Sequence, residues 1–266
     1  MNFRKTTIII LGAAVIGWGV FYTVEYFSER TDEGMIFDQL PVQTPFVEET
    51  HVITEEEPAV PAIPQAEPAQ PKIWSNIPFV SQAPTGEWGR SEFQNGCEEA
   101  SVLMVHAWRT GKAYTKDQAK QELIDMARYQ EEQIGQGIDT DTADTARVLL
   151  DRYFSIADYR IDYDFTLEEL KQSLAEGLSI VPTNGQALKN PNFTRLGPLQ
   201  HMLVVTGYDV MTKEFITNDP GTRKGEGYRY PEQILFDAIR EYPTGKHLPI
   251  QTERKAMIVI PAITIP

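Results

Sequence analysis

Apolar and polar residues alternate along this chain in two periods, one typical of helices and one typical of strands. Four segments carry apolar residues every three or four positions and are predicted helices: residues 97–108, 115–133, 139–154 and 166–177. Gly111, Gly135 and Gly177 end three of these segments, as glycines often do after the last helical turn. Thr166 and Glu169 have the spacing of a capping box at the start of the last one.

Strand patterns lie mostly later in the chain. The predicted strands are residues 73–84 (a short strand entering a loop), 155–163, 178–184, 200–209, 213–219 and 255–263. Because helices cluster early and strands late, we expect an α+β fold in which N-terminal helices pack on a mostly antiparallel sheet. This folded domain is predicted to occupy residues 72–266.

A long apolar segment precedes the domain. Residues 6–24 carry no charge, and at ~1.5 Å per residue a helix of this length spans roughly 28 Å, close to the thickness of a bilayer core. Arg4 and Lys5 come before it and acidic residues follow it, so residues 1–27 are predicted to be a single-pass anchor in the cell membrane, with the C-terminal domain extracytoplasmic. A cleaved signal peptide is the alternative, although no A-x-A-like site follows Val24.

Residues 28–71 show no sustained period. Seven prolines fall between Pro41 and Pro71, and nine acidic residues but no Lys or Arg lie between Thr31 and Pro71. Such a composition predicts an extended linker, either a semi-rigid spacer or a tail without a spacing role. The net charge of −14 argues against a nucleic-acid partner, whose phosphates would be repelled.

The chain contains one cysteine, Cys97, which excludes an intramolecular disulfide framework and a multi-thiolate metal site. Cys97 follows Gly96 at the expected start of an apolar helix, and a helix N-terminus favours the thiolate that acts as a nucleophile. A rigid thiolate there is suited to acyl transfer through a thioester. Glu98 and Glu99 oppose this reading because their charges disfavour a thiolate, and a small buried cysteine is the structural alternative.

A thiol nucleophile needs a base, and the chain offers four histidines. His51 lies in the linker and His247 in a loop. His106 follows Cys97 by nine positions, which places it half a turn around the helix and predicts a structural role. His201, at the start of a predicted strand, is therefore the candidate base.

A hairpin centred near Val210 would place Asp219 opposite His201 in an antiparallel ladder. Asp219 could then hold the imidazole tautomer and stabilise the imidazolium, as a catalytic triad requires. A register slip of one residue would present Asn218 instead. The same residues also have the composition of a simple turn.

An oxyanion hole requires donors aimed at the developing charge. The Cys97 backbone N–H at the helix start is one candidate, and the side-chain amide of Gln82 or Gln94 is the second. The alternating acids of residues 139–144 lack the central glycine of a calcium loop, so helix capping is the preferred reading and no metal or cofactor is expected. Residues 221–229 form a basic loop that either borders the cleft or is simply solvated.

Four segments in order, IPFVSQAP, QNGCEEASVLMV, HMLVVTGYD and ITNDPG, resemble the bacteriocin-processing (double-glycine) peptidase-like domain of the papain-fold cysteine peptidases. The resemblance covers roughly residues 77–260. It implies a papain-like fold with Cys97 as nucleophile, His201 as general base, Asp219 as orienting acid and Gln82 as oxyanion donor. The gap between Gln82 and Cys97 is longer than the resemblance leads us to expect.

The resemblance implies a cysteine peptidase that hydrolyses peptide bonds in a peptide or protein substrate. No G-x-x-x-x-G-K-[ST] motif is present, so the ATP-binding module of transporter-linked members is not implied. Two alternatives remain: an amidase acting on cell-wall peptides, and a catalytically silent papain-fold binding module. The sequence predicts no oligomeric state.

Overall fold

Helices form where the apolar period predicts them, within the residues that the computed structural model describes, 70–135 and 139–263. Helix α2 spans Cys97–Thr110, α3 spans Lys116–Ile134 and α5 spans Leu167–Glu176. Gly111 and Gly135 adopt left-handed backbone conformations at the ends of α2 and α3. Both reciprocal hydrogen bonds of the predicted capping box at the start of α5 are present.

The predicted helix over residues 139–154 is two elements. Helix α4 covers Thr142–Thr145, and a π-helix, η1, covers Ala146–Tyr153. Asp141 caps α4 by accepting a hydrogen bond from the Asp144 backbone N–H, in agreement with the capping interpretation of the acidic run. Two further short helices, α1 (Ser91–Gln94) and α6 (Glu232–Ala238), were not predicted because segments this short show little periodicity.

Six strands form one sheet in the order β1-β6-β2-β3-β4-β5, and every neighbouring pair is antiparallel. The strands are β1 (Arg160–Tyr163), β2 (Gly177–Asn184), β3 (Gln200–Asp209), β4 (Glu214–Asn218), β5 (Tyr228–Pro231) and β6 (Ala256–Pro261). The predicted antiparallel sheet is thus confirmed. Strand β5 was not predicted, and its first two residues are the last two of the predicted basic loop, residues 221–229.

The short strand predicted within residues 73–84 does not form, whereas the loop that it was expected to enter is present. Ile73 forms a single isolated bridge with Gly207, and the chain then leaves the sheet as a loop. Asn76 has a φ of 58°, a left-handed conformation that no regular strand accommodates. This turn of the backbone explains why an apolar segment does not continue along the sheet.

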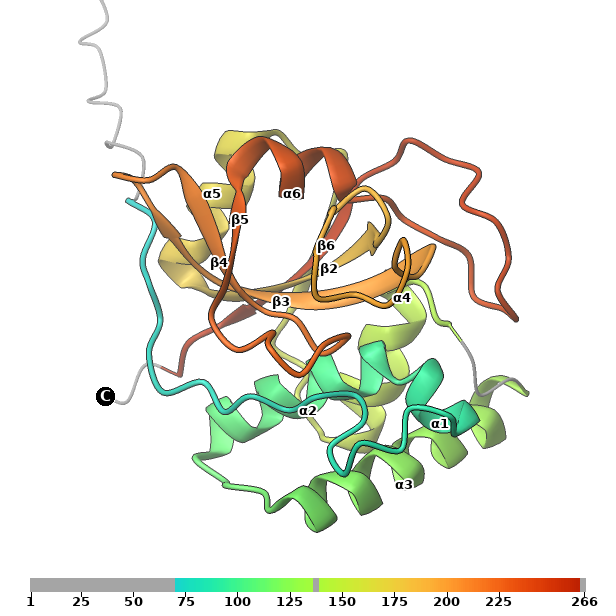
Figure 1. Cartoon of the computed structure of the whole chain (residues 1–266). Helices are drawn as coiled ribbons and strands as arrows, with labels where there is room; N and C mark the ends of the chain where they lie inside the picture. Colours follow the sequence, from blue (N-terminus) through green and yellow to red (C-terminus); the bar gives the residue numbers. More distant parts are fainter. Residues whose placement is uncertain (1–69, 136–138, 264–266) are drawn as a thin grey trace, which may run out of the picture. The chain divides into compact units, whose positions relative to one another are not determined.

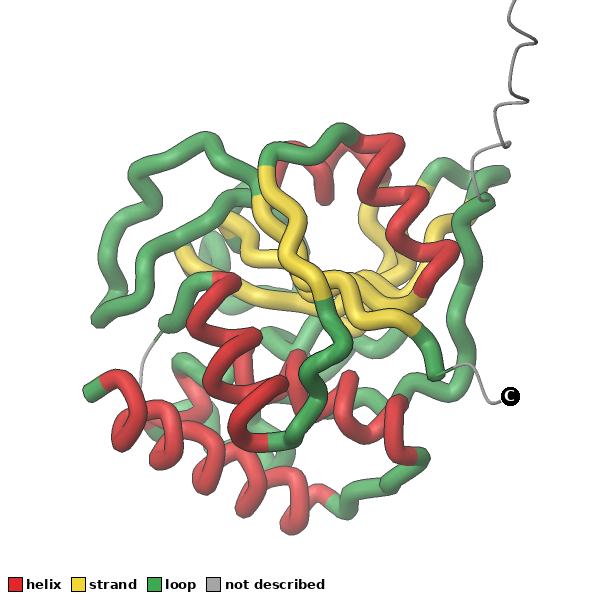
Figure 2. Tube along the Cα trace, turned by 180° about the vertical axis from the view of Figure 1, so that it is seen from behind, coloured by secondary structure: helices red, strands yellow, loops and turns green. Residues whose placement is uncertain are grey.

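Helices cover both faces of the sheet (Figures 1 and 2). On one face, α2, α3 and η1 pack against apolar residues that include Ile180, Met202 and Val204. On the other face, α5 and α6 pack against residues that include Val181, Leu203 and Val205. Consecutive residues of a strand point to opposite faces, and both faces are covered, so nine of the ten residues of β3 are buried.

The predicted membrane anchor, residues 1–27, lies outside the described residues, and so does the linker, 28–71, apart from its last two positions. Among residues 70–135 and 139–263, no helix combines the length and the apolar character that crossing a membrane requires.

Candidate active site

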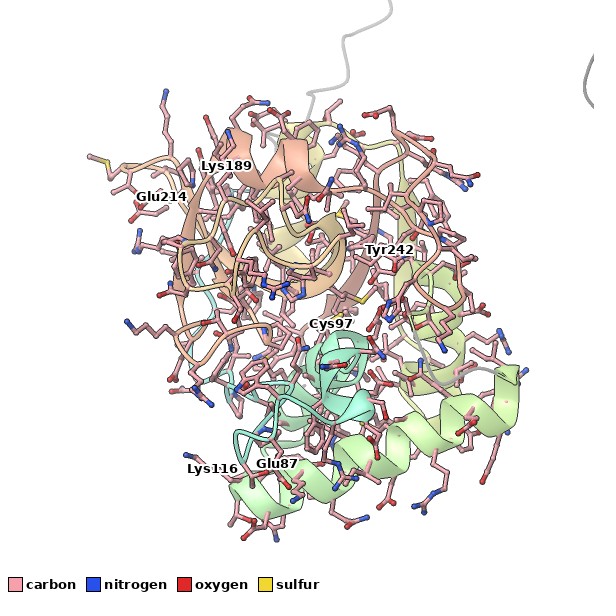
Figure 3. The ribbon with its side chains drawn as sticks, turned by 45° about the vertical axis from the view of Figure 1, so that its right-hand side comes forward. Glu87, Cys97, Lys116, Lys189, Glu214 and Tyr242 are labelled. Atoms are coloured by element: carbon pink, nitrogen blue, oxygen red, sulfur yellow. The ribbon has the colours of Figure 1, made fainter. Side chains whose placement is uncertain are left out.

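Cys97 is the first residue of α2, at the boundary between the helices and the sheet (Figure 3). The side chain is 3% exposed. Ten of the fourteen residues of α2 are buried, so packing of the helix fixes the position of Cys97 at its first residue. The first backbone N–H groups of a helix have no partner within it, so the start of α2 presents free donors beside the sulfur.

Gly96 is required because the backbone of α1 lies very close to its Cα atom. Its φ is −91°, so no left-handed conformation is involved. A Cβ at this position would lie 2.6 Å from the carbonyl oxygen of Glu92 in α1. The glycine therefore allows α1 to fold back against the start of α2, which is a different reason from the tight turn expected from the sequence.

The thiol of Cys97 donates a hydrogen bond to Oε2 of Glu98 at 3.0 Å. Burial, together with the charge and hydrogen bond of Glu98 and the charge of Asp139, raises the pKa of the Cys97 thiol well above its ordinary value. A hydrogen bond from the Met202 backbone N–H has the smaller, opposite effect of lowering the pKa of the thiol. The expected conflict between Cys97 and its acidic neighbour is therefore a real feature of the site.

Glu98 is buried and held by two more donors. Its Oε1 accepts hydrogen bonds from the Tyr242 hydroxyl at 2.7 Å and from the Thr140 backbone N–H at 3.4 Å. Burial and the charge of Asp139 raise the pKa of Glu98 to about 7, against the opposing effect of its hydrogen bonds. Asp139 in turn accepts hydrogen bonds from Nδ1 and from the backbone N–H of His247, each at 3.1 Å.

His201 and Asp219 form a buried pair. Nε2–H of His201 donates to Oδ1 of Asp219 at 2.8 Å, and the two side chains are 1% and 0% exposed. Burial opposes the charge of Asp219, but attraction and a hydrogen bond from His201 lower the pKa of Asp219 below its ordinary value. Asn218 lies elsewhere, with its Oδ1 accepting from the Gly227 backbone N–H.

The predicted ladder pairing of His201 with Asp219 is wrong, although the two side chains meet. The β3–β4 hairpin turns after Val210, with Asp209 opposite Glu214, and a register shift lies between Val205 and Gly207. Its last pair is Val204 with Asn218, so Asp219 lies beyond the end of the ladder. The loop that follows β4 brings the carboxylate back to the imidazole.

Three further donors hold the Asp219 carboxylate. The Tyr230 hydroxyl donates to Oδ2 at 2.6 Å, the Asn190 amide donates to Oδ2 at 3.3 Å, and the Gly221 backbone N–H donates to Oδ1 at 3.0 Å. Asn190 also donates to the Tyr230 hydroxyl at 2.7 Å. These bonds fix both oxygens, so one of them always faces His201.

Gln82 lies beside the start of α2, but its amide hydrogens are occupied. Nε2 donates to the carbonyl oxygens of Phe93 at 2.8 Å and Gln94 at 3.2 Å, while Oε1 is buried without a partner among the described residues. The Gln82 backbone N–H donates to the carbonyl of Pro220, next to Asp219. Gln82 thus connects the Cys97 segment to the Asp219 loop. The side chain of Gln94 is exposed.

Cys97 and His201 line one cavity of about 240 Å³, together with Gln82, Gln94 and the Asp139–His247 pair. Leu199 and Leu248, which are 58% and 43% exposed, border it with apolar surface. The chain therefore gathers a thiol, an imidazole with a buried carboxylate and a side-chain amide around one opening.

The sequence profile of the Peptidase_C39 like family matches residues 74–243. The chain belongs to this family. The matched residues, 74–243, define the C39-like domain, and Cys97, His201 and Asp219 all lie within it.

A solved Bacillus anthracis structure that carries the name C39-like peptidase is similar to the C39-like domain. The sequence identity is 17% and the TM-score is 0.44, over 70% of this chain and 96% of that one. No protein with curated annotation matches the chain.

His106 lies away from the cavity of the C39-like domain. Its ring stacks on Phe154 with centroids 4.0 Å apart and hydrogen-bonds the Tyr114 hydroxyl at 2.9 Å. Within residues 70–135 and 139–263, no three His, Cys, Asp or Glu side chains are arranged to hold a metal ion.

The sequence reasoning missed His247, Tyr230, Asn190 and the contact between Glu98 and Tyr242. A loop position gives no signal for His247, yet this residue pairs with Asp139 and lines the cavity. Tyr230 and Asn190 lie in segments without a recognisable motif. One signal was available: buried acids next to a candidate nucleophile need nearby donors, and tyrosine hydroxyls are common ones.

Proposed function

We propose that this chain is a cysteine peptidase of papain-like fold that hydrolyses peptide bonds with Cys97 as nucleophile, His201 as base and Asp219 as orienting acid. The observation that carries the proposal is the buried His201–Asp219 pair, whose His201 lines the same cavity as Cys97. Because Nε2 of His201 is bound to Asp219, Nδ1 is the nitrogen left to accept the thiol proton.

The proposed reaction begins when the thiol proton moves from Cys97 to Nδ1 of His201. The sulfur attacks the carbonyl carbon of the scissile bond, and the resulting oxyanion collapses to a thioester while His201 returns the proton to the leaving amine. Water then attacks the thioester, which gives the acid and restores the thiol. Asp219 stabilises the imidazolium in both halves of the reaction.

The oxyanion is proposed to bind the Cys97 backbone N–H and the amide of Gln82. For this role Gln82 must release one of its two present acceptors, and the bond to Gln94 at 3.2 Å is the longer of the two. Gln94 stays the alternative donor because it lines the same cavity.

The proposal is tested by alkylating the full chain in membranes with iodoacetamide at pH 7 and following Cys97 by intact mass. Replacing His201→Ala should slow alkylation about 100-fold, the usual contribution of a general base. His106→Gln is the matched control, because it changes a histidine that lies outside the cavity. Alkylation of the native chain no faster than that of the chain in urea would contradict a peptidase.

A second candidate, a catalytically silent binding module, is favoured by one observation. The thiol donates to Glu98, and the surroundings of Cys97 raise its pKa. A silent module predicts slow alkylation that does not depend on His201, so the same measurement separates the two candidates.

We also propose that residues 6–24 anchor the chain in the cell membrane and that residues 28–71 hold the C39-like domain outside the cytoplasm. The uncharged segment and the basic residues before it support this orientation. Resistance to alkaline carbonate extraction, with digestion of the domain by protease added outside spheroplasts, is the expected result. Release of the intact domain into the medium would instead indicate a cleaved signal peptide.

A further inference from the structure

The loop after Asp219 lies against His201 and also lines a second cavity. A Cβ at Gly221 would lie 2.7 Å from Cε1 of His201 and 3.0 Å from Cε1 of Phe193. Gly221 also lines a separate cavity of about 350 Å³. Gly221 therefore lies next to the proposed base and at the edge of this cavity.

The side chains that line this cavity are donors or cations. They come from Trp88, from Asn192 and Thr194 on one loop, and from Thr222, Arg223 and Lys224 on another. No carboxylate lines the cavity, although the chain has 38 acidic residues and 24 basic ones. A cavity of this composition is suited to an anionic group.

Arg223 and Lys224 are free to bind such a group. Neither forms a salt bridge with any residue of the described ranges, whereas Arg229 in β5 is bound to Asp209 and Glu214. The Arg223 guanidinium lies over the Trp88 ring, 5.7 Å from its centroid. Stacking on an aromatic ring orients a guanidinium while leaving its donors available for a carboxylate.

We propose that this cavity is a substrate subsite that binds a carboxylate of the peptide through Arg223 and Lys224. The inference rests on the proposed peptidase function, which it deepens by naming a substrate class. Two sources have this chemistry, an Asp or Glu side chain and a free C-terminus. A planar guanidinium can bind either one with two parallel hydrogen bonds.

The test uses the full chain in membranes and N-iodoacetyl tripeptides as probes of Cys97. One set carries a single Asp at the first, second or third position among glycines, with an amidated C-terminus, and each probe has an Asn partner. A glycine-only pair compares a free C-terminal acid with its amide. Each added residue extends the reach by about 3.5 Å, so the series also locates the subsite along the peptide.

At least one acidic probe should alkylate Cys97 about five- to tenfold faster than its neutral partner at 0.1 M ionic strength, because an oriented charge-assisted bond strengthens binding. Arg223→Gln and Lys224→Gln should each reduce this ratio of the acidic to the neutral alkylation rate. Lys213→Gln is the matched control, since it removes a positive charge from the β3–β4 turn, far from the start of β3.

Failure of the two proposals can be told apart. If neutral probes alkylate Cys97 rapidly in a His201-dependent manner but no acidic probe is preferred, the subsite is wrong and the peptidase proposal stands. A preference that survives both Arg223→Gln and Lys224→Gln would also overturn the subsite. If no probe reacts faster than with the chain in urea, both proposals fail.

Discussion

The carboxyl group of Glu98 contacts the sulfur of Cys97, which the proposed mechanism requires as a thiolate. This carboxyl lies 3.0 Å from Sγ of Cys97, and Tyr242 and Thr140 hold it there. A negative charge at this distance disfavours a second one on sulfur. Because the pKa of Glu98 is raised to about 7, its protonation state at neutral pH controls how strongly it opposes the thiolate.

Replacing Glu98→Gln should therefore increase the rate of Cys97 alkylation by iodoacetamide at pH 7 about tenfold, the effect of lowering the thiol pKa by about one. The glutamine carbonyl can still accept the Tyr242 hydrogen bond, so the shape of the site is retained. A pH–rate profile of alkylation gives the apparent thiol pKa directly. Glu99→Gln is the control, because it neutralises an equally buried acid at the next position. A profile for Glu98→Gln identical to that of the native chain would contradict this account.

The residues that could be selected from the sequence are those whose chemistry is unusual at their position. Cys97 is the only thiol, and His201 is the only histidine in a predicted strand. Tyr230 and Asn190 could not be selected, because a tyrosine in a short strand and an asparagine in a loop are ordinary. Their proximity to Asp219 depends on how two loops fold together, which no local pattern encodes.

Gly96 determines how α1 and α2 meet, and the site depends on this junction. The Glu92 carbonyl approaches so closely that a methyl group at Gly96 would overlap it. Backbone atoms cannot rotate away as a flexible side chain can, so either α1 or the start of α2 has to move. A movement of α2 would displace the sulfur from its place in the cavity.

Gly96→Ala should lower the free energy of unfolding by about 1–3 kcal/mol, the usual cost of overpacking, and should slow Cys97 alkylation. Thermal unfolding followed by circular dichroism and intact-mass alkylation measure the two effects. Gly89→Ala is the matched control, because no atom lies within 4 Å of a Cβ at that position. Equal stability and equal alkylation of the two variants would show that the close approach is unimportant.

Elements with strong local signals were predicted well, and register was not. Periodicity and caps identify α2, α3 and α5, since each signal acts within a few residues. The sequence predicts the wrong centre for the β3–β4 hairpin because the turn residues are not diagnostic. The register shift lies next to Gly207, which also bridges Ile73, a residue outside the hairpin. The apolar residues of the π-helix η1 have a spacing that also fits an α-helix, so the sequence does not distinguish the two helix types.

For the whole domain, buried acids set the dependence of stability on pH. Burial raises the pKa values of Glu98, Glu99 and Asp139 above their ordinary values. Folding therefore favours the protonated acids, and the unfolded chain binds fewer protons than the folded one in this pH range. The stability they contribute is fully present below the ordinary pKa of a carboxyl and is lost as the pH rises through the raised values.

The melting temperature should fall between pH 5 and pH 8, and Glu98 alone should account for about 3 kcal/mol of the loss in unfolding free energy. Glu98→Gln should flatten this dependence, whereas Glu168→Gln, which changes an exposed acid, should leave it as it is. Urea unfolding at several pH values measures the effect. An increase in the stability of the native chain between pH 5 and pH 8 would contradict the predicted loss of stability.

The sheet order also bears on self-association. Its two outermost strands, β1 and β5, have four residues each, and both carry charged side chains, Arg160 and Asp162 in one and Arg229 in the other. Short charged edges are poor templates for pairing with a strand of another molecule. The domain is thus protected against edge-to-edge aggregation, even when many copies are crowded together.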